Sequence, residues 1–298
     1  MKSLLRLRQL AIWSNKLCNI QKRNLSLAYN IIHEGDSTKP PMLMIHGLLG
    51  NKFNFNSVGK ILKEKLPSTT ILSCDVRNHG ESPHSDMMDY KSMSEDTIQL
   101  LNSMNIDKCI LLGHSLGGRI AMYTALTQHN RVEELIVVDV APGDKGIKRG
   151  ISEGPIKYVE AMKLVKFEPG IKPSQARASA HQQLESAIPE KYLRDFALTN
   201  MIETTKGSFG WRLNLDSISQ HAKDFYFLGN EDDFTPYTGR TLFLGGALSK
   251  YILPNDYPDI KRLFTNSDIQ HIPDCGHWVH ADNPKEFASR VSNFLGGS

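Results

Sequence analysis

A serine between two glycines, placed between a strand pattern and a helix pattern, is the feature that most restricts the fold of this chain. The apolar run Ile110–Leu112 leads into Gly113-His114-Ser115-Leu116-Gly117, and apolar residues at helical spacing follow over Ile120–Leu126. A strand, a tight turn and a helix form the context in which a G-x-S-x-G motif presents a serine hydroxyl at a sheet edge. The turn strains the serine backbone, so it needs small neighbours, and the two glycines supply them. We therefore expect Ser115 to be a nucleophile.

Short apolar runs alternate with helical patterns along most of the chain. The helical patterns lie around Val58–Leu66, Met93–Met104 and Ile120–Leu126. The strand runs are Met42–Ile45, Thr70–Ser73, Cys109–Leu112, Leu135–Val140, Thr241–Leu244 and Ile269–Ile272. This alternation predicts an α/β fold with a mostly parallel, twisted sheet flanked by helices. Such sheets bind their ligands at the carboxyl ends of the strands, so the residues that end these runs are the candidates for a site.

The alternation stops between about Gly143 and His221. This segment is charged and helix-biased, and it has no strong strand run. A block of this length between two strands predicts a helical cap over the strand ends, and caps of this kind select substrates and exclude water. We expect a core over residues 26–142 and 222–298 and a cap insertion over 143–221.

The basic residues are concentrated at the N-terminus. Residues 1–24 hold six Lys or Arg and no acid, so the net charge of +3 for the whole chain leaves −3 for the rest. A slightly acidic body argues against a nucleic-acid partner, because neutralising phosphates requires a basic face. An arginine-rich, acid-free segment with leucines for a helical stripe is typical of a mitochondrial presequence, which we predict over residues 1–25; a basic N-terminus without a targeting role is the alternative. No apolar stretch reaches the ~20 residues of a transmembrane helix.

A serine nucleophile needs a histidine to take its proton, and in this motif's usual context that histidine follows the last strand. Three histidines lie there: His271, His277 and His280. His277 is in the loop Asp274-Cys275-Gly276-His277-Trp278, whereas His271 falls within the strand run and His280 is nearer the closing helix. We predict His277 as the base and expect structural or surface roles for the other two.

The acid that orients the histidine is harder to assign. The strand run Thr241–Leu244 has no carboxylate after it until Asp256, whereas the earlier run Leu135–Val138 ends directly in Asp139. A charged residue that closes such a strand lies at the edge of the sheet where the site is expected. We predict Asp139 as the acid and keep Asp256 in reserve; a helix-cap or loop hydrogen bond is the alternative role for Asp139. We expect Asp232 and Asp233 to lie in a solvated loop.

An oxyanion hole needs two backbone N–H donors aimed at the developing negative charge. One is expected from Leu116, directly after the serine. The other is expected from Leu48, within His46-Gly47-Leu48-Leu49-Gly50, where glycines let the backbone turn inward. We expect His46 to brace this loop rather than to transfer protons.

Metal and cofactor sites have little support in the sequence. Asp75 and His79 have no third ligand nearby, so a structural loop is favoured over a metal site. The four cysteines show no C-x-x-C pair and no metal-ligand spacing. Cys275 lies two residues from His277, but it has no turn or donors of its own and is expected to be a small buried residue. We expect no cofactor and no metal.

Several of these segments together resemble the α/β-hydrolase superfamily, and most closely the abhydrolase-domain-11 type, which includes fungal mitochondrial members described as ethanol acetyltransferases. The segments are His46–Gly50, Asp75–Pro83, Gly113–Gly118, Val138–Pro142, Trp211–Leu215 and Gly276–Ala281. The resemblance implies a triad of Ser115, Asp139 and His277 and a mitochondrial location. It further implies that an acetyl group passes from acetyl-CoA to Ser115 and then to an alcohol.

The expected function is therefore a serine acyltransferase that makes short-chain esters such as ethyl acetate from acetyl-CoA and ethanol, with thioesterase and esterase side reactions. Its partners would be small molecules: acetyl-CoA, ethanol and short-chain esters. Two alternatives stay open. One is a carboxylester or thioester hydrolase with the same triad, and the other is a non-catalytic mitochondrial binding module.

Overall fold

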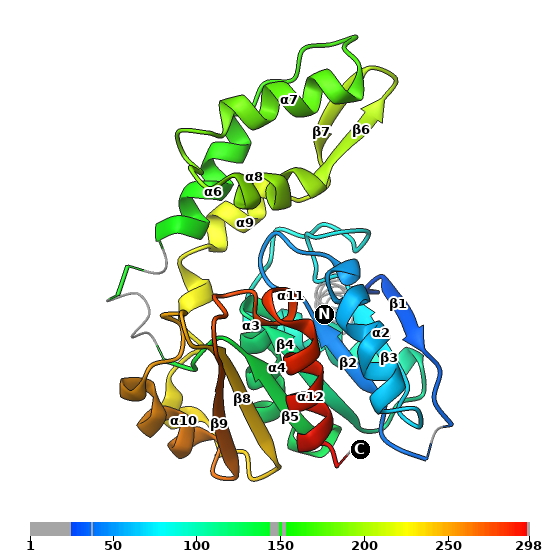
Figure 1. Cartoon of the computed structure of the whole chain (residues 1–298), viewed down its shortest axis with the longest axis vertical. Coiled ribbons are helices and arrows are strands. Elements are labelled where there is room, and N and C mark those ends of the chain that lie inside the picture. The colour runs from blue at the N-terminus through cyan, green and yellow to red at the C-terminus, as the bar shows by residue number, and fades with distance from the viewer. Residues whose placement is uncertain (1–24, 37, 144–148, 151–152, 297–298) are drawn as a thin grey trace, which may run out of the picture.

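The computed structural model describes residues 25–36, 38–143, 149–150 and 153–296 (Figure 1). The predicted presequence lies outside the described residues except for Leu25. None of the described helices is both long and apolar enough to cross a bilayer.

A seven-stranded sheet forms the centre of the molecule, in the order β1-β3-β2-β4-β5-β8-β9. The strands are β1 (Tyr29–His33), β2 (Met42–Ile45), β3 (Ile71–Cys74), β4 (Cys109–His114), β5 (Val132–Val138), β8 (Thr241–Gly246) and β9 (Ser267–Ile272). Every pairing is parallel except that of β1 with β3. The α/β fold predicted from the alternating pattern is thus confirmed.

Strand β1 is the element of this sheet that the sequence analysis missed. It is an edge strand, and Tyr29 and Ile31 on it are 45% and 43% exposed. An edge strand that buries only one face needs no continuous apolar run, whereas the central strands β2, β3 and β4 are buried along their whole length. Five residues are also too few for an alternation of buried and exposed residues to be recognised in the sequence.

Helices cover both faces of the sheet (Figure 1). The helices of the core are α2 (Asn56–Lys65), α3 (Tyr90–Ser103), α4 (Leu116–Thr127), α10 (Tyr257–Leu263), α11 (Val279–Asp282) and α12 (Pro284–Phe294). Buried side chains of α2 and α12 join one apolar cluster with alternate residues of the strands, and those of α3, α4 and α10 join the other. Short 3₁₀ turns lie between the longer elements along the chain: η1 (Lys52–Phe55), η2 (His129–Arg131), η3 (Leu198–Asn200), η4 (Asp224–Tyr226), η5 (Glu231–Asp233) and η6 (Pro254–Asp256).

Residues 153–221, between β5 and β8, form a separate layer over the core (Figure 1). Its elements are α6 (Glu153–Leu164), α7 (Pro173–Gln183), α8 (Lys191–Ala197), β6 (Met201–Thr205), β7 (Ser208–Trp211) and α9 (Leu215–His221). The antiparallel hairpin β6–β7 differs from the purely helical cap that we expected. Its turn contains Gly207 with φ +74°, a left-handed conformation that glycine adopts without strain. Strand β6 is largely exposed and therefore lacks the apolar run that the sequence analysis looked for.

Candidate active site

Ser115 occupies a strained turn between β4, which ends at His114, and α4, which begins at Leu116. Its φ and ψ are 54° and −115°, a backbone conformation that residues other than glycine rarely adopt. A Cβ on Gly113 would lie 2.1 Å from the carbonyl oxygen of Gly117, and a Cβ on Gly117 would lie 2.1 Å from that of Ile45. Both positions therefore require glycine, because any side chain would push the helix away from the sheet.

The Asp139 carboxylate is fully buried directly after β5. Its Oδ1 accepts the backbone N–H of Gly246 at 3.1 Å, and its Oδ2 accepts the hydroxyl of Ser249. Oδ2 also lies 2.7 Å from Nδ1 of His277. Since an ionised carboxylate only accepts hydrogen bonds, the imidazole donates from Nδ1, and its Nε2 is left to accept a proton.

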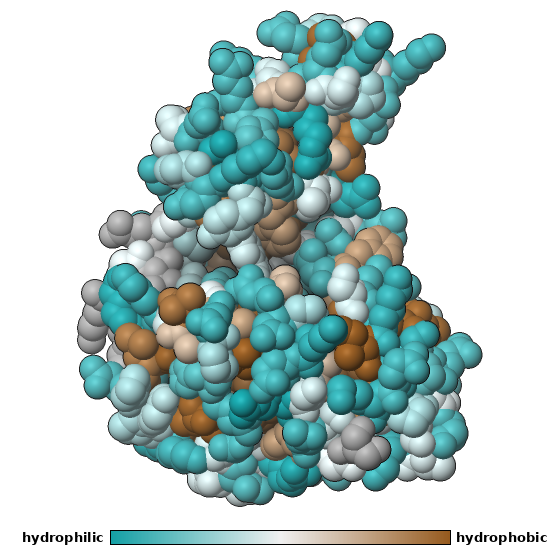
Figure 2. All heavy atoms as spheres, in the orientation of Figure 1, coloured by the Kyte–Doolittle hydropathy of each residue, from teal (hydrophilic) through white to brown (hydrophobic). Residues whose placement is uncertain are grey.

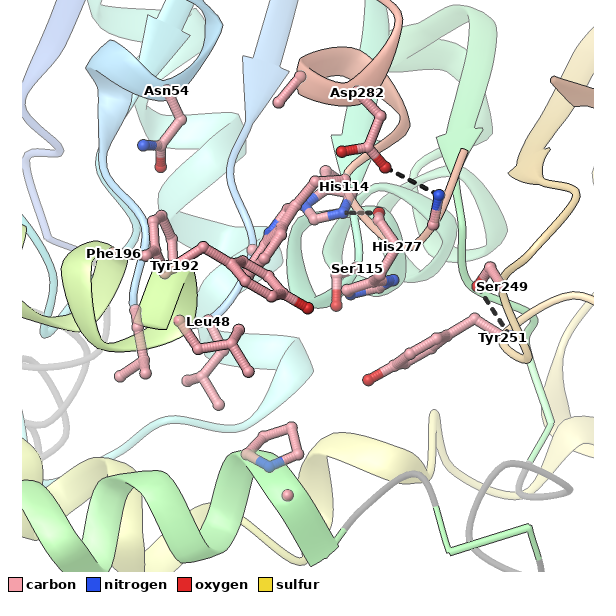
Figure 3. A pocket seen from close by; sticks show the side chains of 18 of the residues that line it. Leu48, Asn54, His114, Ser115, Tyr192, Phe196, Ser249, Tyr251, His277 and Asp282 are labelled. Atoms are coloured by element: carbon pink, nitrogen blue, oxygen red, sulfur yellow. Dashed lines mark hydrogen bonds between the residues drawn. The ribbon is translucent and has the colours of Figure 1, made fainter. Parts of the chain in front are cut away.

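His277 lies between β9 and α11, and its imidazole lines the same cavity as Ser115 (Figure 3). The side chain is 25% exposed, so the ring is open to that cavity. Within the described residues no hydrogen bond joins the Ser115 hydroxyl to His277. Contacts of this kind often tighten only when substrate binds. The structure therefore brings His277 and Asp139 into direct contact and places Ser115 beside them.

The competing candidates make other contacts, although His280 lines the same cavity. His271 contacts the carbonyl of Ile252 through Nε2, and His280 is buried beside Phe55 and His114. Asp256 binds the guanidinium of Arg149 at 3.0 Å rather than a histidine. Asp232 and Asp233 are exposed in η5, and Cys275 is buried.

The two expected oxyanion donors flank Ser115. Leu116 is the first residue of α4, so its N–H has no partner within the helix. Leu48 lies on the loop after β2 and lines the cavity together with Ser115. No acceptor in the part of the chain that the structure describes binds the N–H of Leu48 or Leu116. Two unpaired donors next to a strained serine are what an anionic oxygen bound there would use.

Two buried histidines hold the loop that carries Leu48. Nε2 of His79 accepts the N–H of Leu49 at 3.2 Å, and Nε2 of His46 accepts the N–H of Val76 at 3.0 Å. Burial lowers the pKa of both, that of His79 to about 3, so both rings are neutral near pH 7. Leu49 has a φ of +62°, so this peptide is held in a conformation that it would not adopt freely. The contact of His46 is the bracing role that the sequence analysis expected.

Asp75 belongs to a buried ion pair. Its carboxylate accepts Nζ of Lys52 at 2.9 Å and the backbone N–H groups of Lys52 and Glu81 at 2.6 and 2.8 Å. Lys52 directly follows the Leu48 loop and is 4% exposed. Over the described ranges, no group of three or more His, Cys, Asp or Glu side chains is placed to hold a metal ion.

The cavity above Ser115 is large and mostly apolar. Its volume is about 760 Å³, and it lies in the hollow between cap and core (Figure 2). Tyr158 of α6 and Tyr192 and Phe196 of α8 line it from the cap. Leu48 and Trp278 line it from the core, together with the polar side chains around Ser115. A pocket of this volume accepts a ligand of a few tens of atoms and favours one with a hydrocarbon portion.

Comparison with known proteins agrees with this geometry. A family profile described as "alpha/beta hydrolase fold" matches residues 40–284. The chain is 45% identical over 272 residues to the sn-1-specific diacylglycerol lipase ABHD11 of Danio rerio, covering 91% of this chain and 83% of that protein. It is 29% identical to a probable alcohol acetyltransferase of Saccharomyces cerevisiae, covering 91% of this chain and 83% of that one. A solved marine microorganism esterase matches 91% of this chain and 100% of its own with a TM-score of 0.79 at 33% identity.

The fold and the strained serine turn define a serine hydrolase of the lipase or esterase type. The chain belongs to the α/β-hydrolase family, and its relatives include proteins of the ABHD11 type. The family resemblance drawn from the sequence segments is therefore confirmed. These relatives include both a lipase and a probable acetyltransferase, so they do not distinguish hydrolysis from acetyl transfer to an alcohol.

Sequence reasoning missed three side chains that the site uses. These are Ser249, which donates to Asp139, Tyr251, which stacks on His277, and His79, which accepts from Leu49. The available signal for Ser249 was the strand Thr241–Gly246, which ends without a carboxylate. Because Asp139 comes directly after the neighbouring strand β5, its carboxylate reaches the end of β8. There the N–H of Gly246 and the hydroxyl of Ser249 donate to it.

Proposed function

We propose that Ser115, His277 and Asp139 form a catalytic triad that transfers the acyl group of a carboxylic ester to water. The observation that carries the proposal is the 2.7 Å contact between His277 Nδ1 and Asp139 Oδ2, made by an imidazole that lines the same cavity as the strained serine. The carboxylate fixes the tautomer in which Nε2 carries no proton and can take that of the serine, and it stabilises the imidazolium that forms.

In this mechanism the Ser115 hydroxyl oxygen attacks the ester carbonyl carbon while Nε2 of His277 takes its proton. The carbonyl oxygen becomes negative and binds the N–H groups of Leu48 and Leu116, each worth about 3–4 kcal/mol of transition-state stabilisation. The intermediate collapses, the leaving alcohol takes the proton from His277, and an acyl-Ser115 ester remains. Water then attacks that ester with the same base and releases the acid.

For the substrate class we propose esters with an apolar acyl chain, including acylglycerols. The cavity volume of about 760 Å³ and its aromatic lining support a substrate larger than a short-chain ester. The vertebrate relatives described as diacylglycerol lipases support the same class. A panel of p-nitrophenyl esters from acetate to palmitate, together with acylglycerol emulsions, tests it. We expect kcat/KM to rise with chain length, and activity confined to acetate would contradict this substrate class.

Acetyl transfer from acetyl-CoA to ethanol is the second candidate, supported by the yeast relative described as a probable alcohol acetyltransferase. Against ~55 M water, an alcohol at ~50 mM needs roughly a thousandfold kinetic preference, or ~4 kcal/mol, to compete equally. Purified protein supplied with acetyl-CoA, with and without ethanol, separates the two reactions. Ethyl acetate that increases with ethanol supports transfer, and free acetate alone at every ethanol level excludes it.

The triad itself is tested by labelling with a fluorophosphonate followed by intact mass and peptide mapping. We expect one adduct on Ser115 and none on the variant Ser115→Ala, whose ester hydrolysis should fall by at least ~10⁴-fold. A folded protein that is unmodified at Ser115 would contradict the triad. It would instead favour a non-catalytic binding role, which the Ser115→Ala variant would then retain in full.

A mitochondrial location is also proposed, on the composition of the N-terminal segment. Residues 1–25 fused to a fluorescent protein should direct it to mitochondria, and the same fusion with its six basic residues replaced by Gln should not. A diffuse signal from the unmodified fusion would contradict the proposal.

A further inference from the structure

The loop between β8 and η6, residues 247–253, contacts both members of the His277–Asp139 pair. The Ser249 hydroxyl donates to Asp139 Oδ2. It also accepts the backbone N–H of Tyr251 at 3.2 Å (Figure 3). Through these two bonds the position of Tyr251 is tied to that of the carboxylate.

The same loop is also tied to the segment that carries His277. The N–H groups of Ala247 and Leu248 donate to the carbonyl oxygens of Ile272 and Cys275, each at 2.9 Å. The backbone of the loop is thus held from both sides.

The Tyr251 ring lies flat against the imidazole of His277. The two ring centroids are 3.8 Å apart and the ring planes differ by 16°, which is a parallel stack. His114 also lies near His277, but at 4.7 Å with planes 44° apart, so it does not stack. Figure 3 shows the Tyr251 side chain in the cavity that Ser115 and His277 line.

The face of a phenol ring is electron-rich and attracts a cation within about 6 Å of its centroid. His277 becomes a cation when it takes the serine proton, so the stack stabilises the protonated ring more than the neutral one. We propose that Tyr251 is a positioning residue that increases the proton affinity of His277 and holds its ring plane toward Ser115. This inference rests on the proposed function, in which His277 is the base.

The other titratable groups around His277 come from four elements. Asp139 follows β5, His114 ends β4, His280 and Asp282 belong to α11, and Lys250 is exposed on the Tyr251 loop. Burial lowers the pKa of His114 well below its usual value and that of His280 to about 4, so both are neutral near pH 7. Asp282 accepts the N–H of Gly276 at 2.8 Å. Burial raises the pKa of the Tyr251 hydroxyl, so the phenol stays neutral as well.

The proposal is tested by titrating His277 in the full-length protein by NMR with isotope-labelled histidine, its signal assigned with His277→Gln. Tyr251→Leu keeps the apolar bulk but removes the aromatic face, and we expect the pKa of His277 to fall by about 0.5 unit. Tyr251→Phe keeps the face, and we expect a pKa within ~0.2 unit of the unmodified protein. An unchanged pKa in Tyr251→Leu, or an equal fall in both variants, would overturn the proposal.

A series that keeps the ring shape tests the same idea without risk to folding. Phenylalanine at position 251 with one, two and three ring fluorines has a progressively weaker negative face. We expect the pKa of His277 to fall stepwise along this series, and a constant pKa would overturn the proposal. Tyr257→Leu is the matched control, because Tyr257 lies beside His271, 6.5 Å between centroids, and should not affect His277.

The kinetic consequence follows in the same direction. In Tyr251→Leu the acid limb of the kcat/KM profile should move about 0.5 unit to lower pH, and the plateau should fall by no more than about threefold because the base is weaker. The NMR titration needs no turnover, so it decides on Tyr251 even if Ser115 resists fluorophosphonate. If Ser115 is not labelled by fluorophosphonate, the proposed function fails, but the effect of Tyr251 on the pKa of His277 is still decided by the titration.

Discussion

The floor and the roof of the active-site cavity are built differently. On the floor, the Asp139 carboxylate receives three donors and the Leu48 loop is held by two buried histidines and a buried ion pair. On the roof, the cap contributes aromatic side chains such as Phe196 and Tyr192, and Tyr192 is 61% exposed. The groups of the floor are held by directed hydrogen bonds, whereas the roof is lined by aromatic side chains and is partly open to solvent.

This difference follows from what each part must do. Proton transfer and charge stabilisation need groups held within a fraction of an ångström, which only directed hydrogen bonds provide. Binding a hydrocarbon chain needs apolar area, which is not directional and tolerates variation in shape. Substitutions on the floor should therefore change kcat, and substitutions on the roof should change KM.

The largest effect is expected from Asp139→Asn. An amide can donate toward the imidazole and favour the wrong tautomer, so kcat should fall by about 10³–10⁴-fold with little change in KM. Steady-state kinetics on a p-nitrophenyl ester measure this. Asp256→Asn is the control, since that carboxylate binds Arg149 and its loss should leave kcat near that of the unmodified protein. The opposite ranking of the two variants would show that the acid is wrongly assigned.

A smaller loss is expected from His79→Phe, which removes the acceptor of the Leu49 N–H and frees the loop that carries Leu48. We expect kcat to fall by roughly 10²-fold, and the affinity for a boronic-acid transition-state analogue to fall with it, while KM changes little. His79→Gln offers an amide oxygen to the same N–H and should recover much of the activity. If kcat falls equally in both variants and both are less thermally stable, His79 stabilises the fold and does not position the Leu48 N–H.

On the roof, Phe196→Ala should raise KM for long-chain esters by about tenfold and leave kcat on acetate esters unchanged. The ring packs against Trp278 at 5.4 Å, and its loss removes apolar contact worth about 1–1.5 kcal/mol to a chain bound there. Tyr29→Ala removes an exposed aromatic from the edge strand β1 and should change neither constant. A fall in kcat on all substrates would show that the roof also shapes the catalytic geometry.

The smallest effect concerns stability at low pH. Burial holds the pKa of His79 at about 3 in the folded state, below the value of 6.5 for an unperturbed histidine. Above pH 6.5 neither state binds the proton, and below it only the unfolded state does, so the free energy of unfolding should fall as pH decreases toward 3. Between pH 6.5 and 5.5 this loss should be about 1 kcal/mol smaller in His79→Gln, or a Tm difference of about 2–4 °C. Parallel Tm-against-pH curves for the two proteins would contradict this expectation.

Much of the floor could be predicted from the sequence because it follows local rules. The glycines around Ser115 predict the turn, and a carboxylate that closes the strand before the cap points to Asp139 as the candidate acid. The contribution of Tyr251 and Ser249 could not be predicted, because a loop that binds side chains 110 residues away leaves no local pattern. The hairpin β6–β7 and the edge strand β1 were missed for another reason: both are partly exposed and lack a strong periodic signal.

By itself, the sequence determined the α/β class, the position of the serine turn and the candidate acid and histidine that follow it along the chain. These depend on local propensity, on steric demands at two glycines and on the direction in which parallel strands end. Only the tertiary structure decided which donors surround the Asp139 carboxylate, which histidines hold the Leu48 loop and which ring lies on His277. Such contacts join residues far apart in the chain, and packing alone brings their atoms within bonding distance.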